Sequence, residues 1–222
     1  KRWRMTVLAV IPARWQSTRF PGKPLAQIAG REMIARVWDQ VVMTPSVDQT
    51  VVATDSDKIA VFCQENDMDV VMTRSDHATG SDRLAEVAEK ISADIYVNVQ
   101  GDEPLIEPTS IDAVSKCLLA AVKRGIGVST GYITAASDDQ MDNPSVVHLV
   151  PALDGTVITF SRFPLPYPQG EAMQRTVHVG LYAFTSDALA KYSAWEQGPV
   201  EKSESIEILR FLDNLKVVGN FS

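Results

Sequence analysis

The stretch Val7-Leu-Ala-Val-Ile11, followed at once by Pro12-Ala-Arg-Trp-Gln-Ser-Thr-Arg-Phe-Pro-Gly-Lys-Pro-Leu25, decides the fold. The first part is a short apolar run typical of a buried strand, and the prolines of the second part exclude a regular helix. The second part carries fixed cations, hydroxyl groups and a glycine, namely Arg14, Arg19, Lys23, Ser17, Thr18 and Gly22. Such side chains hold phosphoryl oxygens, and glycine lets the backbone approach them closely. The loop therefore predicts a polyphosphate site, with a solvated basic turn as the alternative.

Helical and strand patterns alternate after this loop. Helices are predicted where apolar residues recur three and four positions apart, over residues 31–42, 56–66, 79–91 and 108–124. Buried strands are predicted between them, over residues 49–53, 70–72 and 95–99. This βαβ rhythm predicts a parallel sheet. The loop 100–104 and the basic loop should therefore open at one sheet edge, where α/β proteins bind their ligands.

The pattern changes at residue 128. Strands are predicted over residues 128–133, 146–150, 156–160 and 177–184, with a hairpin turn at Asp154-Gly155. Helices are predicted over residues 186–192 and 200–214. We expect one domain over residues 1–222, divided into parts 1–127, 128–195 and 196–222.

Charge and cysteine content narrow the class of protein. The net charge is −7, which argues against a nucleic-acid partner because binding to a phosphate backbone needs a basic face. Cys63 and Cys117 have no metal-ligand or redox spacing, so both are expected to be reduced thiols in a cytosolic protein. No apolar stretch is long enough for a membrane-spanning helix, and a membrane partner is not expected.

The acidic turn Gly101-Asp102-Glu103 directly follows a predicted strand. Carboxylate oxygens are the ligands that Mg²⁺ prefers, and few protein ligands suffice where phosphates and water complete the shell. An acidic turn that caps the next segment is the alternative. Because the basic loop opens at the same edge, the turn is a candidate Mg²⁺ site, and both interpretations stay open at this point.

These motifs together resemble one enzyme family. Pro12-Ala-Arg-x-x-Ser-Thr-Arg-Phe-Pro-Gly-Lys-Pro-Leu25 is similar to the signature of the 3-deoxy-manno-octulosonate cytidylyltransferases, which join CTP to an eight-carbon acidic sugar. The resemblance continues, in the family's order, through Val51-Val-Ala-Thr-Asp55, Met72-Thr-Arg-x-Asp-His77, Thr79-Gly-Ser-Asp-Arg-Leu-Ala-Glu86 and Asn98-Val-Gln-Gly-Asp-Glu-Pro104. It covers nearly the whole chain. It implies a three-layer α/β nucleotidyltransferase fold, Rossmann-like, with a mostly parallel sheet and a smaller strand-rich lobe for sugar binding and dimerisation.

The resemblance also implies roles for individual residues. The triphosphate would be held by Arg14, Arg19 and Lys23, with Asp102 as both catalytic residue and Mg²⁺ ligand. The nucleotide would lie near Ser17, Ser81, Arg83 and Gln100. The acid sugar would contact Arg162, His178, Tyr182 and Glu207. Taken alone, Arg83 is also typical of a solvated charge at a helix start, and His178 of a packed strand residue.

Two departures from the family pattern matter. Ile208 stands where the family usually has a glutamine after the glutamate at 207, which suggests a sugar with 8-amino in place of 8-hydroxy. The family's aspartate after this helix, which completes its metal site, does not occur in this sequence; either a loop has been left out of the sequence, or the aspartate is deleted and catalysis is affected. Leu215-Lys-Val-Val-Gly-Asn-Phe-Ser222 resembles the family's final helix with a gap of roughly twenty residues before it.

The sequence thus favours a cytoplasmic, dimeric cytidylyltransferase for a 3-deoxy-manno-octulosonate-type sugar in lipopolysaccharide synthesis. Its catalysis would consist of positioning and charge neutralisation without a protein nucleophile. Two alternatives stay open: a sialate-type enzyme with the same nucleotide chemistry, and a CTP-binding module without catalysis. No G-x-G-x-x-G or P-loop spacing is present, which argues against a nicotinamide dehydrogenase or a P-loop enzyme.

Overall fold

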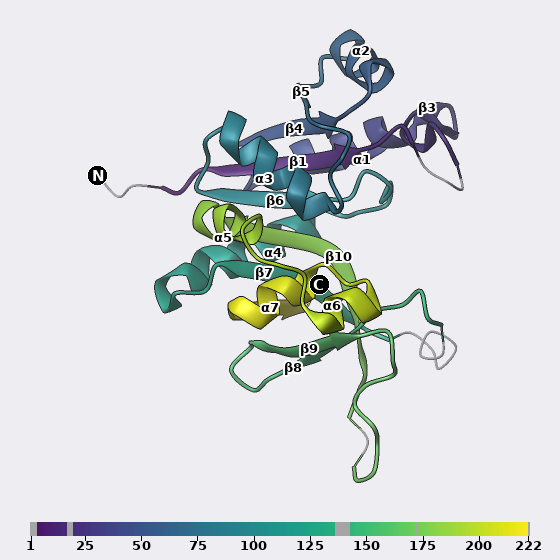
Figure 1. Ribbon diagram of the computed structural model, residues 1–222. Helices are drawn as coiled ribbons and strands as arrows, with labels where there is room; N and C mark the ends of the chain where they lie inside the picture. The colour runs from purple at the N-terminus through teal and green to yellow at the C-terminus, as the bar shows by residue number, and fades with distance from the viewer. Residues whose placement is uncertain (1–3, 17–19, 136–142, 172, 222) are drawn as a thin grey trace.

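The computed structural model describes residues 4–16, 20–135, 143–171 and 173–221. Within them, nine strands form one mixed sheet (Figure 1), and a tenth and an eleventh strand form a small separate ribbon. The strands are β1 (Val7–Ala13), β2 (Gln27–Ile28), β3 (Arg31–Glu32), β4 (Gln49–Thr54), β5 (Val70–Met72), β6 (Ile95–Val99), β7 (Val128–Thr134), β8 (His148–Pro151), β9 (Val157–Ser161), β10 (Thr176–Thr185) and β11 (Val217–Phe221). The α-helices are α1 (Met33–Val42), α2 (Asp57–Glu65), α3 (Gly80–Lys90), α4 (Pro108–Ala121), α5 (Ser186–Tyr192), α6 (Pro199–Glu204) and α7 (Ile208–Asn214).

The first half of the chain forms the predicted parallel sheet. β1 pairs in parallel with both β4 and β6, and β4 pairs in parallel with β5. β1, β4 and β6 are buried on both sides, as parallel strands covered by crossover helices are, whereas the edge strand β5 is partly exposed. The carboxyl ends of these strands therefore meet at one edge, and the loops after β1 and β6 both open there.

Helices cover both faces of the sheet, so the predicted three-layer α/β fold is confirmed. Alternate residues of β1 point to opposite faces: Leu8 and Val10 pack with α3, α5 and α7, whereas Val7, Ala9 and Ile11 pack with α1, α2 and α4. Figure 1 shows α3 and α5 side by side against β6 and β10. The two apolar layers fix the sheet rigidly behind its loop edge.

The second half extends the same sheet with antiparallel strands. β10 lies between β6 and β7 and runs antiparallel to both. Its register against β7 shifts between Val179 and Tyr182, which is a β-bulge, and bulges often re-aim side chains beside functional sites. β8 and β9 form the predicted antiparallel pair, and the turn between them contains Gly155 at φ 79°.

The segment after α7 differs from the prediction. Residues 217–221 form strand β11, which pairs in parallel with β7, and Leu215 leads into it directly from α7. The interpretation of this segment as a final helix is therefore wrong, because the residues pair as a strand. The alternating side chains of a strand let Val217 enter the apolar layer beside α7.

The predicted helix over residues 200–214 is also wrong in part, because it is two helices. α6 ends at Glu204, and Ser205 adopts a left-handed conformation at φ 53° before α7 begins at Ile208. A regular helix cannot pass through that conformation. The break turns the carbonyl groups of Glu204 and Ser205 toward Arg162, which donates to both.

Two smaller expectations concern the thiols and the membrane. Cys63 is buried, Cys117 is half-buried, and both are free. Across the described ranges, none of the helices combines the length and the apolar character needed to cross a lipid bilayer.

Candidate functional site

The basic loop after β1 and the acidic loop after β6 lie directly against each other. A Cβ atom on Gly101 would stand only 2.7 Å from the carbonyl oxygen of Pro12, so glycine is required for this approach. Lys23 Nζ lies 2.7 Å from Asp102 Oδ2. The two side chains predicted to act on a triphosphate and a metal are thus brought together, across 79 positions of sequence.

The basic loop is folded around one tryptophan. Gly22, at φ 73°, donates its N–H to the Trp15 carbonyl, and a Cβ at this glycine would stand 3.0 Å from the indole ring. Lys58 of α2 lies over the same ring, with Nζ 4.5 Å from its centroid. This packing fixes the backbone just before Lys23. Ser17, Thr18 and Arg19 lie outside the described residues, so their predicted phosphate contacts stay predictions.

Two cavities open at this edge and share residues. One has a volume of about 750 Å³ and is lined by Arg14, Lys23, Gly80, Gln100 and Asp102 among others. The next, of about 660 Å³, contains the side chains predicted to bind the sugar, Arg162, His178, Tyr182 and Glu207, and shares Gln100 and Asp102 with the first. A site for an anionic ligand therefore continues into a site lined by hydrogen-bonding groups.

His178 is a neutral side chain with a defined tautomer. Burial lowers its pKa to about 3, and its ring packs against Phe160 and Tyr182. Thr130 Oγ1 has one proton and donates it to the Leu181 carbonyl, 3.0 Å away. The contact of 2.9 Å between Thr130 Oγ1 and His178 Nε2 therefore requires Nε2 to be the donor. Nδ1 is left as an acceptor, which suits a ligand hydroxyl group better than proton abstraction.

Arg162 lines the second cavity and joins three segments. Its Nε donates to the Glu204 carbonyl at 2.6 Å and its Nη1 to the Pro144 carbonyl at 2.9 Å. The Glu204 carboxylate accepts from Ser161 Oγ and from the Arg162 backbone N–H, both at 2.6 Å. Glu204 is thus engaged within the protein, and it does not serve as a free acceptor for an ammonium group. The predicted contact of Arg162 with a sugar carboxylate stays a prediction.

Glu207 faces the start of helix α3. Its Oε2 accepts from the Ser81 backbone N–H at 3.3 Å, and burial raises the pKa of this carboxyl although that contact lowers it. Tyr182, on the neighbouring strand β10, also has a raised pKa, through burial and then through the charge of Glu207. The predicted capping box at Thr79 and Asp82 is confirmed, and it fixes the turn that presents Gly80 and Ser81 to the cavities.

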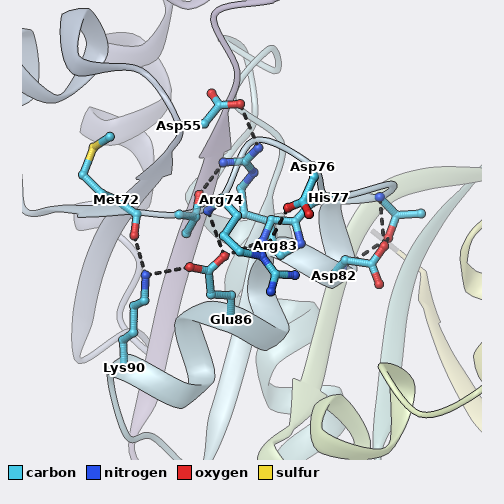
Figure 2. A network of polar contacts seen from close by, with 11 residues as sticks. Asp55, Met72, Arg74, Asp76, His77, Asp82, Arg83, Glu86 and Lys90 are labelled. Carbon is cyan, nitrogen blue, oxygen red and sulfur yellow. Dashed lines mark hydrogen bonds and ion pairs between the residues drawn. The ribbon is translucent and has the colours of Figure 1, made fainter.

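Arg83 lies inside the protein, one turn into α3. Its side chain is fully buried, and it donates to Thr73 and, at 3.3 Å, to Asp55 Oδ2 (Figure 2). Burial lowers its pKa, Asp55 raises it, and the charge of Arg14 lowers it. Arg83 lines neither of the two cavities. The side chain therefore supports the loop after β5, and a contact with the pyrimidine stays a prediction.

Glu86 holds the same loop from the next turn of α3. Its carboxylate accepts from the Arg74 backbone N–H at 2.9 Å, pairs with His77 Nε2 at 2.5 Å and binds Lys90 Nζ at 2.6 Å (Figure 2). Burial alone would raise the pKa of Glu86, but these three partners lower it to about 2. The loop 73–79 that leads to the first residues of α3 is thereby held by hydrogen bonds to this carboxylate.

Ile208 does not reach the sugar-side cavity. It is fully buried in the apolar layer that contains Phe211 and Leu209. Ile208 therefore does not line the pocket, and the suggested preference for an 8-amino sugar has no support from this residue. No feature of the described residues then separates the amino sugar from the hydroxy sugar.

Asp102 has the chemistry that a hard cation requires. Its carboxylate is half exposed at the junction of the two cavities, and the Lys23 ammonium group is already paired with it. No group of three His, Cys, Asp or Glu side chains arranged to hold a metal ion occurs within residues 4–16, 20–135, 143–171 and 173–221. The site fits Mg²⁺ held by one carboxylate, with ligand oxygens and water supplying the remaining positions.

Two residues at the site were missed from the sequence. Asp55, directly after β4, pairs with Arg83, although its motif gave it no role. Asn98 is fully buried in β6 among apolar neighbours. An amide inside the run Ile95-Tyr-Val-Asn-Val99 was a readable signal, because a buried polar side chain needs a partner.

A parallel α/β sheet whose basic loop and acidic loop meet at the strand ends, above a cavity for an anionic ligand, defines a nucleotidyltransferase. A family model described as cytidylyltransferase matches residues 8–217, and the chain belongs to this family.

Relatives of known name align with nearly the whole of this chain. The chain is 40% identical to a 3-deoxy-manno-octulosonate cytidylyltransferase of Syntrophotalea carbinolica, over 95% of this chain and 87% of the relative. It is 41% identical to the protein of the same name from Solibacter usitatus, over 94% of this chain and 82% of the relative. A solved structure of CMP:2-keto-3-deoxy-manno-octonic acid synthetase complexed with CTP superposes with a TM-score of 0.91 at 35% identity, covering 98% of this chain and 90% of that one.

Proposed function

We propose that this protein transfers the cytidylyl group of CTP to 3-deoxy-manno-octulosonate and releases pyrophosphate, as a step in lipopolysaccharide synthesis. The observation that carries the proposal is the continuous pair of cavities joined at Gln100 and Asp102. One cavity has cations for a triphosphate, and the other has an arginine, a neutral histidine and a tyrosine for a hydroxylated acid. The named relatives support the same pair of substrates.

The basic residues act by charge and position. Lys23 and Arg14 bind the phosphate oxygens of CTP, and Lys23 must leave Asp102 in part to do so. The anomeric hydroxyl of the sugar attacks the α-phosphorus and releases its proton to solvent, the new C–O–P linkage forms, and the bond to the β-phosphate oxygen breaks. Pyrophosphate carries away the negative charge, which the same cations stabilise. The two substrates react because the shared edge of the cavities holds them in line.

The sugar-side residues read hydroxyl groups and the carboxylate. His178 Nδ1 accepts a hydrogen bond from a sugar hydroxyl group, because Nε2 already donates to Thr130. With a pKa of about 3, this ring is a weak base, so we assign it recognition and not proton removal. Arg162 supplies the cationic side chain of this cavity for the carboxylate.

Asp102 would hold Mg²⁺ when the nucleotide is bound. The ion would neutralise phosphate charge there. This cofactor, a homodimeric state and a cytoplasmic location are part of the proposal, and each rests on the family resemblance. Free thiols at Cys63 and Cys117 are compatible with a reducing compartment.

A pyrophosphate-release assay tests the function. The enzyme is incubated with CTP or UTP and with 3-deoxy-manno-octulosonate, its 8-amino analogue or sialate, in the presence of Mg²⁺. We expect turnover with CTP and 3-deoxy-manno-octulosonate to exceed every other pair. Higher turnover with sialate would contradict the substrate assignment, and CTP binding without pyrophosphate release from any pair would show a binding module.

A further inference from the structure

Asn98 is a buried amide without a hydrogen-bond partner in the described part of the chain. Its side chain is fully enclosed in β6, and both Oδ1 and Nδ2 are unpartnered there. A buried unsatisfied amide destabilises a fold, and native proteins keep few of them. An apolar residue of similar size would satisfy the same strand position better. The amide therefore calls for an explanation outside folding.

The amide lies beneath the point where the cavities meet. The position that a Cβ on Gly80 would occupy is 3.5 Å from Asn98 Nδ2, 3.8 Å from Glu207 Oε1 and 4.0 Å from Gln100 Nε2. These three polar atoms come from β6, from the loop before α7 and from the loop after β6. Gln100 and Glu207 line the cavities, and Asn98 does not. The register of the sheet also places Asn98 opposite Tyr182.

We propose that Asn98 is a positioning residue, which orients Gln100 and Glu207 toward a hydroxyl group of the bound ligand. This inference rests on the proposed function. When the ligand draws the two side chains together over Gly80, Asn98 Nδ2 donates to the Glu207 carboxylate and Asn98 Oδ1 accepts from the Gln100 amide. The absent side chain at position 80 leaves the room for this closure.

The ligand group that Gln100 and Glu207 would bind is a hydroxyl group, because it must both accept and donate a hydrogen bond. Once Asn98 is paired, Gln100 retains an N–H donor and Glu207 retains a carboxylate acceptor. A hydroxyl group accepts from the first and donates to the second. At this junction it belongs either to the ribose of the nucleotide or to the sugar acid, and these two sources are separable by experiment.

Asn98→Leu is the central test. We expect a melting temperature equal to or above that of the wild type, because the unpartnered amide is removed without loss of volume. We expect kcat/KM to fall at least about ten-fold, which is the loss in rate that corresponds to one lost hydrogen bond to a charged group. A lower melting temperature would show that the amide has a structural partner, and activity within about two-fold of wild type would show that it orients nothing. Either result overturns the proposal.

Gly80→Ala is a second, independent test. The methyl group meets its neighbours at ordinary contact distances, so the fold should be kept, but it occupies the space of the closure. We expect kcat/KM to fall while the melting temperature does not. Gly170→Ala is the control, because Gly170 is exposed with nothing within 4 Å of the added atom. Wild-type activity in Gly80→Ala would overturn the proposal.

Separate measurements identify the source of the hydroxyl. If the ribose is read, the variants lose the preference of the wild type for CTP over 2′-deoxy-CTP. If the sugar acid is read, their KM for the sugar rises and the nucleotide preference is kept. The proposal is overturned if both variants keep the wild-type nucleotide preference and the wild-type KM for the sugar. Absence of pyrophosphate release by the wild type would instead refute the proposed function, whereas the melting temperatures test the amide independently of turnover.

Discussion

Asp102→Asn should not weaken the binding of CTP when Mg²⁺ is absent, and it should strengthen it slightly. In the free protein Lys23 Nζ lies 2.7 Å from Asp102 Oδ2, so a triphosphate must compete with a carboxylate for this cation. The amide keeps the shape of the side chain but removes the competing charge. It also removes one negative charge beside the phosphates.

The magnitude follows from exposure. The side chains of Lys23 and Asp102 are 41% and 51% exposed, and ion pairs this open contribute about 0–1 kcal/mol. Asp102→Asn should therefore tighten CTP binding by at most about five-fold. Lys23→Ala removes a charge-assisted phosphate contact of about 1.5–3 kcal/mol, so it should weaken binding about 10- to 150-fold.

Titration calorimetry of CTP in EDTA buffer measures both variants against the wild type. Addition of Mg²⁺ should reverse the order for Asp102→Asn, which loses turnover because an amide does not supply the charge that a hard cation requires. If Asp102→Asn weakens metal-free binding as much as Lys23→Ala does, Asp102 contacts the nucleotide directly and the reasoning fails.

Three further predictions concern stability. Arg210→Ala should lower the free energy of unfolding by about 3–5 kcal/mol, because it leaves the Glu201 carboxylate, paired at 2.7 Å, buried without its partner. Urea unfolding measures this, and a loss below about 1 kcal/mol would place the pair in solvent. Glu86 has a folded pKa of about 2, below an unfolded value of about 4.3, so its stabilisation is present above pH 4.3 and lost toward pH 2. The difference in unfolding free energy between wild type and Glu86→Gln should shrink over that window, and a pH-independent difference would contradict it. Ile208→Gln should cost about 1–3 kcal/mol of stability by burying an unpaired amide and leave sugar preference unchanged; a changed preference would return this residue to the pocket.

Local pattern was sufficient where burial and period agree. Three elements were predicted with the bounds that the structure gives, namely residues 70–72, 95–99 and 186–192. The capping box at Thr79 was predicted from its sequence motif. The meeting of the two loops followed from the parallel sheet alone. These features depend on short-range sequence and on topology, which hydrophobic period reports.

Tertiary contacts decided the rest. Ser205 adopts a left-handed conformation, and its carbonyl accepts a hydrogen bond from Arg162, which is 43 positions away in the sequence. A contact between residues so far apart cannot be predicted from the local sequence pattern. The break resets the helical phase and places Ile208 in the core, which reversed the interpretation of that residue. Residues 217–221 have no alternating apolar pattern, and their strand is set by pairing with β7.

Direct detection of the product tests the central claim. Phosphorus NMR of the enzyme with CTP, 3-deoxy-manno-octulosonate and Mg²⁺ should show a new phosphodiester signal from the CMP-sugar growing in step with pyrophosphate. The same mixture with Asp102→Asn should show neither. Release of free CMP or inorganic phosphate without a phosphodiester signal would contradict the account, because the acceptor would then be water and not the sugar hydroxyl.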